Sequence, residues 1–257
     1  MTQQLDIEVA DGVCRIVFTR PEAFNALSED MARGLVEQLH AARSDDAIRV
    51  VVITGSGGAF SAGADLNGEN PVENFGEDTM DGANLITRSI VGLAKPVVAA
   101  VNGIAAGVGA SICFAADLAV ATESAAFLLA FSRIGLMPDG GSSLTVAAAV
   151  GRARAMRMAL LAEPLSARDA YDHGLVSHVV ADAEFEATVD KVARRLAAGP
   201  PLAFAATKKA VNAATLTGLE DALEREKRGQ LALFTTADAA EGTRAFVEKR
   251  RPTFTGR

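Results

Sequence analysis

The sequence has few cysteines, and neither lies in a pattern that binds a metal or forms a disulfide framework. Only Cys14 and Cys113 occur among the 257 residues, and both lie in apolar runs. Cysteine is among the residue types most often buried, so we interpret both as buried thiols. Two isolated cysteines form neither a disulfide framework nor a C-x-x-C metal site. We therefore expect no metal site.

Positive charge and long apolar runs are also scarce. The formal net charge is −7, which argues against nucleic acid as the main partner, although a local lysine can still hold phosphate. The first residues lack the basic-then-apolar form of a signal peptide, and no uncharged apolar run is long enough to cross a bilayer. With 49% hydrophobic and 22% charged residues, the composition is that of a soluble globular protein, and we expect it in the cytoplasm with no membrane partner.

Two stretches share one design. VVVITGSGGAFSAGADL (50–66) and KPVVAAVNGIAAGVGAS (95–111) each begin with an uninterrupted apolar run and continue into a bend of small residues. Such runs are typical of strands covered on both faces of a mostly parallel sheet. Both bends then fall at the same end of the sheet, where a starting helix offers N–H groups without intrahelical partners. The two bends can therefore point two backbone donors at one oxygen.

Strands and helices are predicted along the rest of the chain. Asp11-Gly12 suits a type I′ hairpin, and Ser28 is expected to cap a helix. The segment 67–82 is rich in Gly, Asn, Asp and Glu, and we expect a mobile loop over the site. The predicted strands are 7–9, 13–19, 50–54, one from 96, 118–122, 126–130 and 175–180. The predicted helices are 28–42, 85–93, 107–116, 142–163 with a break at Gly151, a short one after Ser166, one capped by Asp182, 202–216, 219–235 and 238–250. Strand-strand-helix units of this kind favour a spiral, although the pattern leaves a doubly wound sheet open.

Four segments carry a resemblance to a known family. RPEAFNAL, FSAGADL, NGIAAGVGAS and GLMPDGG occur in this order and resemble the crotonase superfamily, the enoyl-CoA hydratases and isomerases. The second and third segments together are specific, whereas either alone is weak. The resemblance implies an α/β fold: a crotonase-like spiral of ββα units over 1–198 and a C-terminal helical trimerisation segment over 199–257. It implies an acyl-CoA thioester substrate, no cofactor other than the coenzyme A of that substrate, and a homotrimer or a dimer of trimers.

By this resemblance, the N–H groups of Ala64 and Val108 form an oxyanion hole for the thioester carbonyl. Preorganised donors of this kind contribute roughly 10²–10³ in rate each. Relatives usually carry glycine where Val108 stands, so we expect a narrower site. The simpler reading is that the small residues only allow close packing of helix and strand.

The acid–base groups depart from the archetypal hydratase. Its two glutamates match Ser111 and Phe131 here, so ordinary two-glutamate hydration is not expected. Asp139 matches a catalytic aspartate of several branches, among them certain isomerases and the aryl-CoA dehalogenases. One such group can carry a 1,3-proton shift, and apolar neighbours such as Phe131 and Met137 are expected to raise its pKa. Pro-Asp-Gly is also a common turn sequence, which leaves a purely structural Asp139 open.

Other titratable groups are weaker candidates. The dehalogenases resembled here use a histidine before the second strand, and this chain has none between His40 and His173. We expect the three histidines to be non-catalytic. Glu69 and Glu73 can reach the site from the loop, although a solvated role is the simpler expectation.

The resemblance also implies coenzyme A contacts. They fall on Ala23, Ala62, Ala64, Asp65 and Leu66, with Phe131 and Phe246 lining the acyl tunnel. Lys249 matches a lysine that reaches phosphate from a neighbouring subunit. As alternatives, Asp65 can cap a helix and Lys249 can interact with a helix dipole.

Three functions follow from these residues. The leading hypothesis is double-bond isomerisation of an enoyl-CoA through an enolate, with Asp139 moving the proton. The second is hydration, with water activated by Asp139 or by a loop carboxylate. The third, from a different class, is a non-catalytic acyl-CoA-binding protein.

Overall fold

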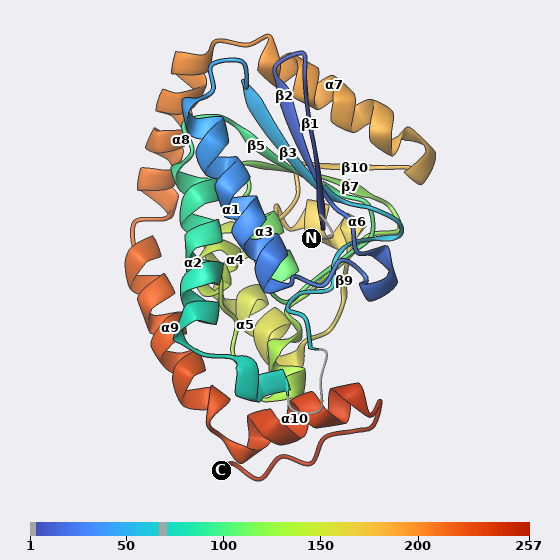
Figure 1. Cartoon of the computed structure of the whole chain (residues 1–257), viewed down its shortest axis with the longest axis vertical. Coiled ribbons are helices and arrows are strands. Elements are labelled where there is room, and N and C mark those ends of the chain that lie inside the picture. Colours follow the sequence, from blue (N-terminus) through green and yellow to red (C-terminus); the bar gives the residue numbers. More distant parts are fainter. Residues whose placement is uncertain (1–3, 67–70) are drawn as a thin grey trace.

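Two β-sheets organise the chain (Figure 1). The computed structural model describes residues 4–66 and 71–257. The larger sheet has the strand order β1-β2-β3-β5-β7-β10, and the smaller one has the order β4-β6-β8-β9. The strands are β1 (Leu5–Ala10), β2 (Val13–Phe18), β3 (Val50–Gly55), β4 (Ala59–Ser61), β5 (Val97–Val101), β6 (Ile104–Ala106), β7 (Leu118–Thr122), β8 (Ala126–Leu128), β9 (Leu165–Ser166) and β10 (His178–Val180).

Helices surround the two sheets (Figure 1). The α-helices are α1 (Glu29–Ser44), α2 (Glu77–Gly92), α3 (Val108–Ala115), α4 (Ser142–Val150), α5 (Arg152–Leu161), α6 (Ala167–Asp172), α7 (Phe185–Ala197), α8 (Pro201–Thr215), α9 (Leu219–Phe234) and α10 (Ala237–Val247). The 3₁₀ turns are η1 (Pro21–Ala23), η2 (Pro71–Asn74), η3 (Ala130–Ile134) and η4 (Asp182–Glu184). No helix in the described part of the chain is long and apolar enough to cross a membrane.

The central strands β3 and β5 of the larger sheet are buried on both faces, as the apolar runs predict. Val51 and Ile53 of β3 belong to the core beneath α1, α2 and α3. Their neighbours Val50 and Val52 pack on the other side with Phe185 and Val189 of α7. Alternate residues of a strand point to opposite faces, so a strand between two helix layers has no polar position. Cys14 and Cys113 are buried thiols, as predicted.

The spiral of strand-strand-helix units is confirmed. In each of two consecutive units, a long strand of the larger sheet is followed by a short strand of the smaller one and then by a helix: β3-β4-α2 and β5-β6-α3. The two small-residue bends therefore follow β4 and β6 rather than β3 and β5. The N-terminal hairpin also agrees with its prediction, because Asp11 and Gly12 have φ of 51° and 81°, as a type I′ turn requires. Ser28 caps α1 by accepting a hydrogen bond from the N–H of Met31.

The prediction of a loop over 67–82 is wrong in part. Residues 67–70 lie outside the described residues, but Pro71–Asn74 form η2 and α2 begins at Glu77. Glu77 and Asp78 favour a helix start through the helix dipole, and the hydroxyl of Thr79 accepts a hydrogen bond from the N–H of Gly76. Met80 is buried, and this tertiary contact outweighs the poor helix propensity of the segment.

Several predicted boundaries also differ. The strand expected over 175–180 is only β10, because the segment pairs with β7 from Ser177, whose N–H and hydroxyl both bond the carbonyl of Ala119. Asp182 does not cap α7. Its carboxylate accepts the N–H of Ser124 instead, and η4 precedes the helix. The strand expected over 126–130 ends at Leu128, where the chain enters η3.

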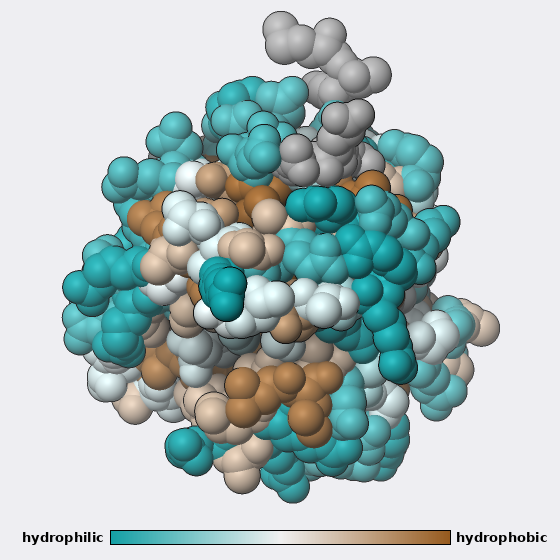
Figure 2. All heavy atoms as spheres, turned by 90° about the horizontal axis from the view of Figure 1, so that it is seen from below, coloured by the Kyte–Doolittle hydropathy of each residue, from teal (hydrophilic) through white to brown (hydrophobic). Residues whose placement is uncertain are grey.

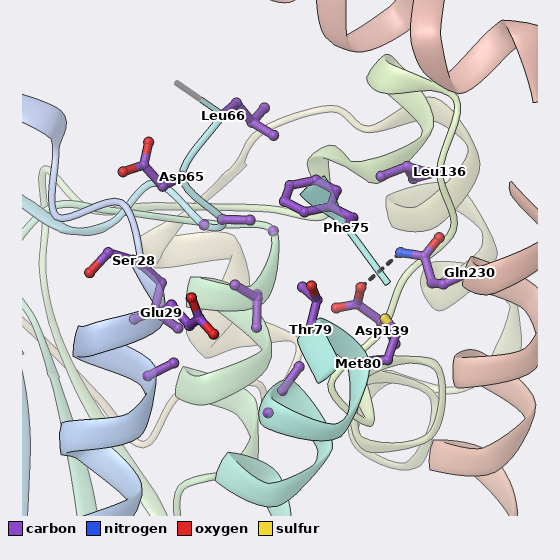
Figure 3. Close-up of a pocket in the computed structure, with 18 of the residues that line it drawn as sticks. Ser28, Glu29, Asp65, Leu66, Phe75, Thr79, Met80, Leu136, Asp139 and Gln230 are labelled. Atoms are coloured by element: carbon purple, nitrogen blue, oxygen red, sulfur yellow. Dashed lines mark hydrogen bonds between the residues drawn. The ribbon is translucent and has the colours of Figure 1, made fainter. Parts of the chain in front are cut away.

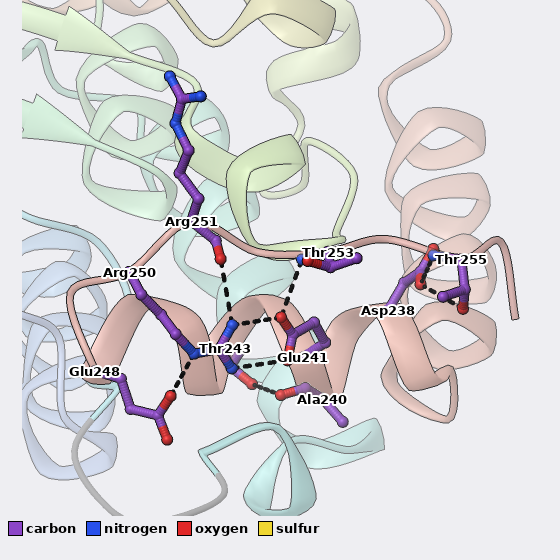
Figure 4. A network of polar contacts seen from close by, with 9 residues as sticks. All are labelled: Asp238, Ala240, Glu241, Thr243, Glu248, Arg250, Arg251, Thr253 and Thr255. Atoms are coloured by element: carbon purple, nitrogen blue, oxygen red, sulfur yellow. Dashed lines mark hydrogen bonds and ion pairs between the residues drawn. The ribbon is translucent and has the colours of Figure 1, made fainter.

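The C-terminal tail folds back along α10 (Figure 4). Glu241 accepts two hydrogen bonds from the Arg250 guanidinium at 2.6 and 2.8 Å, and one from the N–H of Thr253 at 3.0 Å. These contacts, the guanidinium first, lower the pKa of Glu241 to about 2. Asp238 accepts the N–H groups of Thr255 and Gly256 at 2.6 and 2.8 Å. Helix α10 therefore ends at Val247, earlier than predicted, and Lys249 lies beyond it with φ of 55°.

Candidate active site

The two small-residue bends meet because their preceding strands pair. β4 and β6 are parallel, with Ala59 opposite Ile104 and Ser61 opposite Ala105. The chain then turns at Gly63, which has φ of 101°. A Cβ at this glycine would lie 2.9 Å from the carbonyl oxygen of Ala106, so a larger residue would push the bends apart. The glycine-rich sequences thus allow the two backbones to touch.

One N–H group in each bend is left without an acceptor. Val108 is the first residue of α3, so its N–H has no intrahelical partner. Beside Ala64, the carbonyl of Gly63 and the N–H of Asp65 are both bonded to Leu27, in a parallel bridge that leaves the Ala64 N–H unused. Within the described chain, neither the Ala64 nor the Val108 N–H donates a hydrogen bond. Both residues line the same cavity.

That cavity has a volume of about 1460 Å³. Its walls come from α1, α2, the two bends, η3, α9 and α10. Most of the predicted site residues line it: Ala62, Ala64, Asp65, Leu66, Val108, Phe131, Asp139 and Phe246. Ala23 and Lys249 are not among the described lining residues. Ala23 ends η1 beside Phe24, which does line the cavity.

The end of the molecule that carries α10 is seen in Figure 2, where hydrophobic residues form patches between hydrophilic ones. The large apolar residues exposed on α10 are Phe246 and Val247. Phe246 is 61% exposed although it also lines the cavity. The cavity wall at α10 is therefore open to the surface in the single chain.

Asp139 lies on the wall formed by α2 and α9 (Figure 3). Its side chain is buried, with 8% of the residue exposed. Oδ2 accepts a hydrogen bond of 2.7 Å from Nε2 of Gln230, whereas Oδ1 is buried without a partner among the described residues. Figure 3 shows that this second oxygen points away from Gln230 and toward the interior of the cavity.

Burial raises the pKa of Asp139 to about 7, as the sequence predicts. The hydrogen bond from Gln230 opposes this rise, and the nearby Glu226 carboxylate adds to it. A carboxyl with a pKa near neutrality can both accept and return a proton at physiological pH. Asp139 therefore has the properties of a general acid–base, in addition to its place in a turn.

Hydrogen bonds fix the loop that carries Asp139. The Asp139 carbonyl accepts hydrogen bonds from the hydroxyls of Ser111 and Ser142, at 2.8 and 2.7 Å. Glu226 accepts the N–H groups of Gly141 and Ser143 at the start of α4, at 2.7 and 2.9 Å. Ser111, at the position of a family glutamate, thus holds the backbone of Asp139.

The other titratable candidates differ in where they lie. Asp65 forms an ion pair with Arg20 at 2.8 Å. Glu73 lines the cavity from η2, and Glu69 is outside the described residues. The ring of His40 contacts the hydroxyl of Ser89 at 3.2 Å, away from the cavity lining. Over residues 4–66 and 71–257, no three His, Cys, Asp or Glu side chains are grouped to hold a metal ion.

Sequence reasoning missed the contribution of α9. Glu226 and Gln230 are both 1% exposed and lie four residues apart on the face that also buries Ala222 and Leu223. Polar residues at core positions of an amphipathic helix were the available signal, because such groups are buried only with partners. Their partners lie far away in the sequence and were not predictable.

Comparison with known proteins gives a consistent result. A family model described as enoyl-CoA hydratase/isomerase matches residues 8–257. The chain is 44% identical over 252 residues to a probable enoyl-CoA hydratase of Rhodobacter capsulatus, and 39% identical over 254 residues to the 1,2-epoxyphenylacetyl-CoA isomerase of Escherichia coli, with 97% of each chain covered in both cases. The crystal structure of an enoyl-CoA hydratase from Mycobacterium avium subsp. paratuberculosis superposes with a TM-score of 0.93 at 47% identity, covering 99% of this chain and 100% of the other.

Proposed function

The chain belongs to the enoyl-CoA hydratase/isomerase family of the crotonase superfamily, and we propose that it moves the double bond of an enoyl-CoA thioester through an enolate. Enzymes of this family act on CoA thioesters. The observation that carries the proposal is one buried carboxyl, Asp139, with a free oxygen and a pKa of about 7 in the same cavity as two unused N–H groups.

In the proposed reaction the thioester carbonyl lies between the N–H groups of Ala64 and Val108. As a proton leaves the carbon chain, the electron pair moves onto the carbonyl oxygen and forms an enolate. Two fixed donors stabilise that charge without reorganising, which supports roughly 10²–10³ in rate for each. The start of α3 adds its positive dipole at Val108.

Asp139 moves the proton. Oδ1 takes it from one carbon, the double bond shifts as the enolate forms, and Oδ1 returns it to the carbon two positions away. The carboxylate is regenerated, so no other reagent is consumed. General acid–base catalysis of this kind contributes about 10²–10⁴.

Apolar walls near Asp139 favour an uncharged acyl group. Met80, Ile86, Phe131 and Leu136 line this part of the cavity. For the coenzyme A portion we propose contacts with Ala62, Ala64, Asp65 and Leu66, and with Ala23 at the rim. The first four lie in the bend that follows β4 and Ala23 ends η1, so we expect mainly backbone groups of these segments to face the ligand.

We also propose a homotrimer or a dimer of trimers, built with the C-terminal helices. Helix α8 buries none of its residues in the single chain, and Leu202 is 85% exposed. Lys249 is exposed just beyond the end of α10. In such an assembly, the Lys249 of one subunit can contact the phosphates of a ligand bound to its neighbour. Light scattering of the purified protein measures the assembly directly.

Hydration is the second candidate, because the most similar relatives named above include hydratases as well as an isomerase. The experiment offers 3-enoyl-CoA, 2-enoyl-CoA and 3-hydroxyacyl-CoA separately and identifies the products by mass and retention time. Exchange between the two enoyl forms supports isomerisation. A 3-hydroxy product without that exchange supports hydration, and binding without any product supports an acyl-CoA-binding protein.

The variant Val108→Pro tests the second donor. Proline removes the N–H, but it is well accepted at the first position of a helix, so α3 should persist. We expect a loss of about 10²–10³ in kcat, with the control Val108→Ala close to the wild type. Equal activity of the two variants would exclude the Val108 N–H from the reaction.

A further inference from the structure

Helix α9 presents two buried polar side chains to the loop that carries Asp139. Glu226 and Gln230 lie on the face that meets the loop before α4, and both are almost fully buried. Glu226 bonds the backbone of that loop. Among the described residues, Gln230 is the partner of the Asp139 carboxyl group.

The orientation of the Gln230 amide is set from both ends. Its Oε1 accepts the N–H of Met137 at 3.1 Å, and its Nε2 donates to Oδ2 of Asp139 at 2.7 Å. A flipped amide would place its NH₂ against the N–H of Met137 and its carbonyl against a carboxylate, losing both bonds. The amide therefore keeps a donor on Oδ2.

The backbone of Asp139 is fixed as well. Its carbonyl is held by Ser111 and Ser142, so the backbone from which the carboxyl group projects is fixed. With Oδ2 bonded to Gln230, Oδ1 is the oxygen without a partner among the described residues, and it points away from Gln230 (Figure 3). The three residues that bond Asp139 come from different helices: Ser111 from α3, Ser142 from α4 and Gln230 from α9.

We propose that Gln230 is a positioning residue that occupies Oδ2 of Asp139, so that Oδ1 alone carries the proton. This inference rests on the proposed function, in which Asp139 is the acid–base. It assigns the proton transfer to one oxygen atom. It also makes a residue of the C-terminal segment part of the catalytic apparatus.

The surroundings of Asp139 make the effect of Gln230 measurable. From α9, Glu226 is the charged group that acts on the carboxyl, and it favours the protonated form. The other packed elements present uncharged groups: Met80 and Thr87 from α2, Val108 and Ser111 from α3, and Ser142 from α4. The Gln230 donor favours the carboxylate and so opposes Glu226. Its loss should raise the pKa of Asp139.

The test compares Gln230→Met with the wild type. Methionine is similar in length but has no N–H donor. The control is Glu224→Gln, an exposed change on the same helix. Carboxyl ¹³C NMR of aspartate-labelled protein follows the titration of Asp139, and the signal is assigned by its absence in Asp139→Asn. We expect the Asp139 titration to move up by about one pH unit in Gln230→Met, a tenfold rise in proton affinity, and to stay unchanged in the control.

Kinetics provide the second readout. In Gln230→Met, the acid limb of kcat/KM should move up by the same amount, and kcat at pH 7 should fall by about tenfold or more while KM stays within about twofold. If Gln230→Met does not fold, Gln230→Glu keeps the acceptor for Met137 and places a second carboxyl beside Asp139. The two groups would then share a proton, and the titration should move up further.

An unchanged Asp139 titration in the folded variant would overturn the inference, as would a change in KM alone. A different experiment tests the proposed function itself. If wild type and Asp139→Asn process enoyl-CoA equally, Asp139 is not the acid–base, whatever Gln230 does to its titration.

Discussion

Asp139 is buried, whereas the side chain of Asp117 keeps 21% of its surface accessible, and the oxygens of the two carboxyl groups are held in different ways. Oδ2 of Asp117 accepts the N–H of Val97 at 2.7 Å and the ammonium group of Lys208 at 2.7 Å. Lys208 also bonds the carbonyls of Ile90 and Lys95, so it ties α8 to the end of the larger sheet. Asp139 has a neutral amide on one oxygen and no described partner on the other.

The difference separates a structural carboxylate from a reactive one. Burial raises the pKa of both groups, but the cation beside Asp117 opposes the rise, and no cation plays that part beside Asp139. A paired carboxylate holds elements together and has no reason to accept a proton. A half-satisfied one is costly to keep charged, and for that reason it can exchange protons near neutral pH.

The same isosteric change should abolish most of the activity at Asp139 and leave it nearly unchanged at Asp117. Asp139→Asn removes the proton carrier, so isomerisation should fall by about 10²–10⁴. Asp117→Asn lies outside the cavity and should keep the activity per folded molecule close to that of the wild type. Steady-state rates normalised to folded protein measure both. A comparable loss at the two sites would end the distinction drawn between them.

Breaking the structural pair should cost stability instead. Lys208→Met leaves the partly exposed Asp117 without its cation, and we expect a loss of about 1 kcal/mol in the free energy of unfolding. Urea denaturation measures it. The double variant Lys208→Met/Asp117→Asn should recover much of that loss, because the unpaired charge is removed. If the double variant is as unstable as Lys208→Met, the pair is not what holds α8.

Asp139→Asn should stabilise the protein at alkaline pH. The folded-state pKa of Asp139, about 7, lies well above the ordinary pKa of an aspartate, so the folded protein binds the proton more tightly than the unfolded chain. Its contribution to stability is therefore present at low pH and is lost as pH rises through about 7. The gain from Asn should be on the order of 2 kcal/mol at pH 8 and should vanish near pH 4. A destabilised variant at pH 8 would mean that the buried charge is compensated.

Wild-type activity should follow the same titration. Proton abstraction needs the carboxylate form of Asp139, so kcat/KM should be level above about pH 7 and fall below it, tenfold for each pH unit. A pH–rate profile measures this limb. A limb near pH 4 would show that Asp139 titrates like an exposed carboxyl.

The sequence predicted the parts of the fold that local patterns determine. The apolar runs at 50–54 and from 96, the Asp11-Gly12 turn and the Ser28 cap are all confirmed, because each depends on neighbouring residues. The early start of α2 was not predicted, since Met80 and its neighbours are helical through burial against distant segments.

In the active site, too, the sequence predicted local features but not contacts between distant segments. The bends and Asp139 lie in short segments that a sequence shows directly. Gln230 and Asp139 are 91 residues apart in the sequence, and so are Lys208 and Asp117. Such pairs are set by how α8 and α9 pack on the sheets, which no local pattern specifies. Only the polar residues on the buried face of α9 indicated that partners existed.

A crystal structure with a bound, unreactive acyl-CoA tests the central claim most directly. The account predicts the thioester oxygen within hydrogen-bond distance of the nitrogens of both Ala64 and Val108, with Oδ1 of Asp139 facing the carbons between which the proton moves. A thioester oxygen bound elsewhere in the cavity, or an acyl chain that runs away from Asp139, would contradict it.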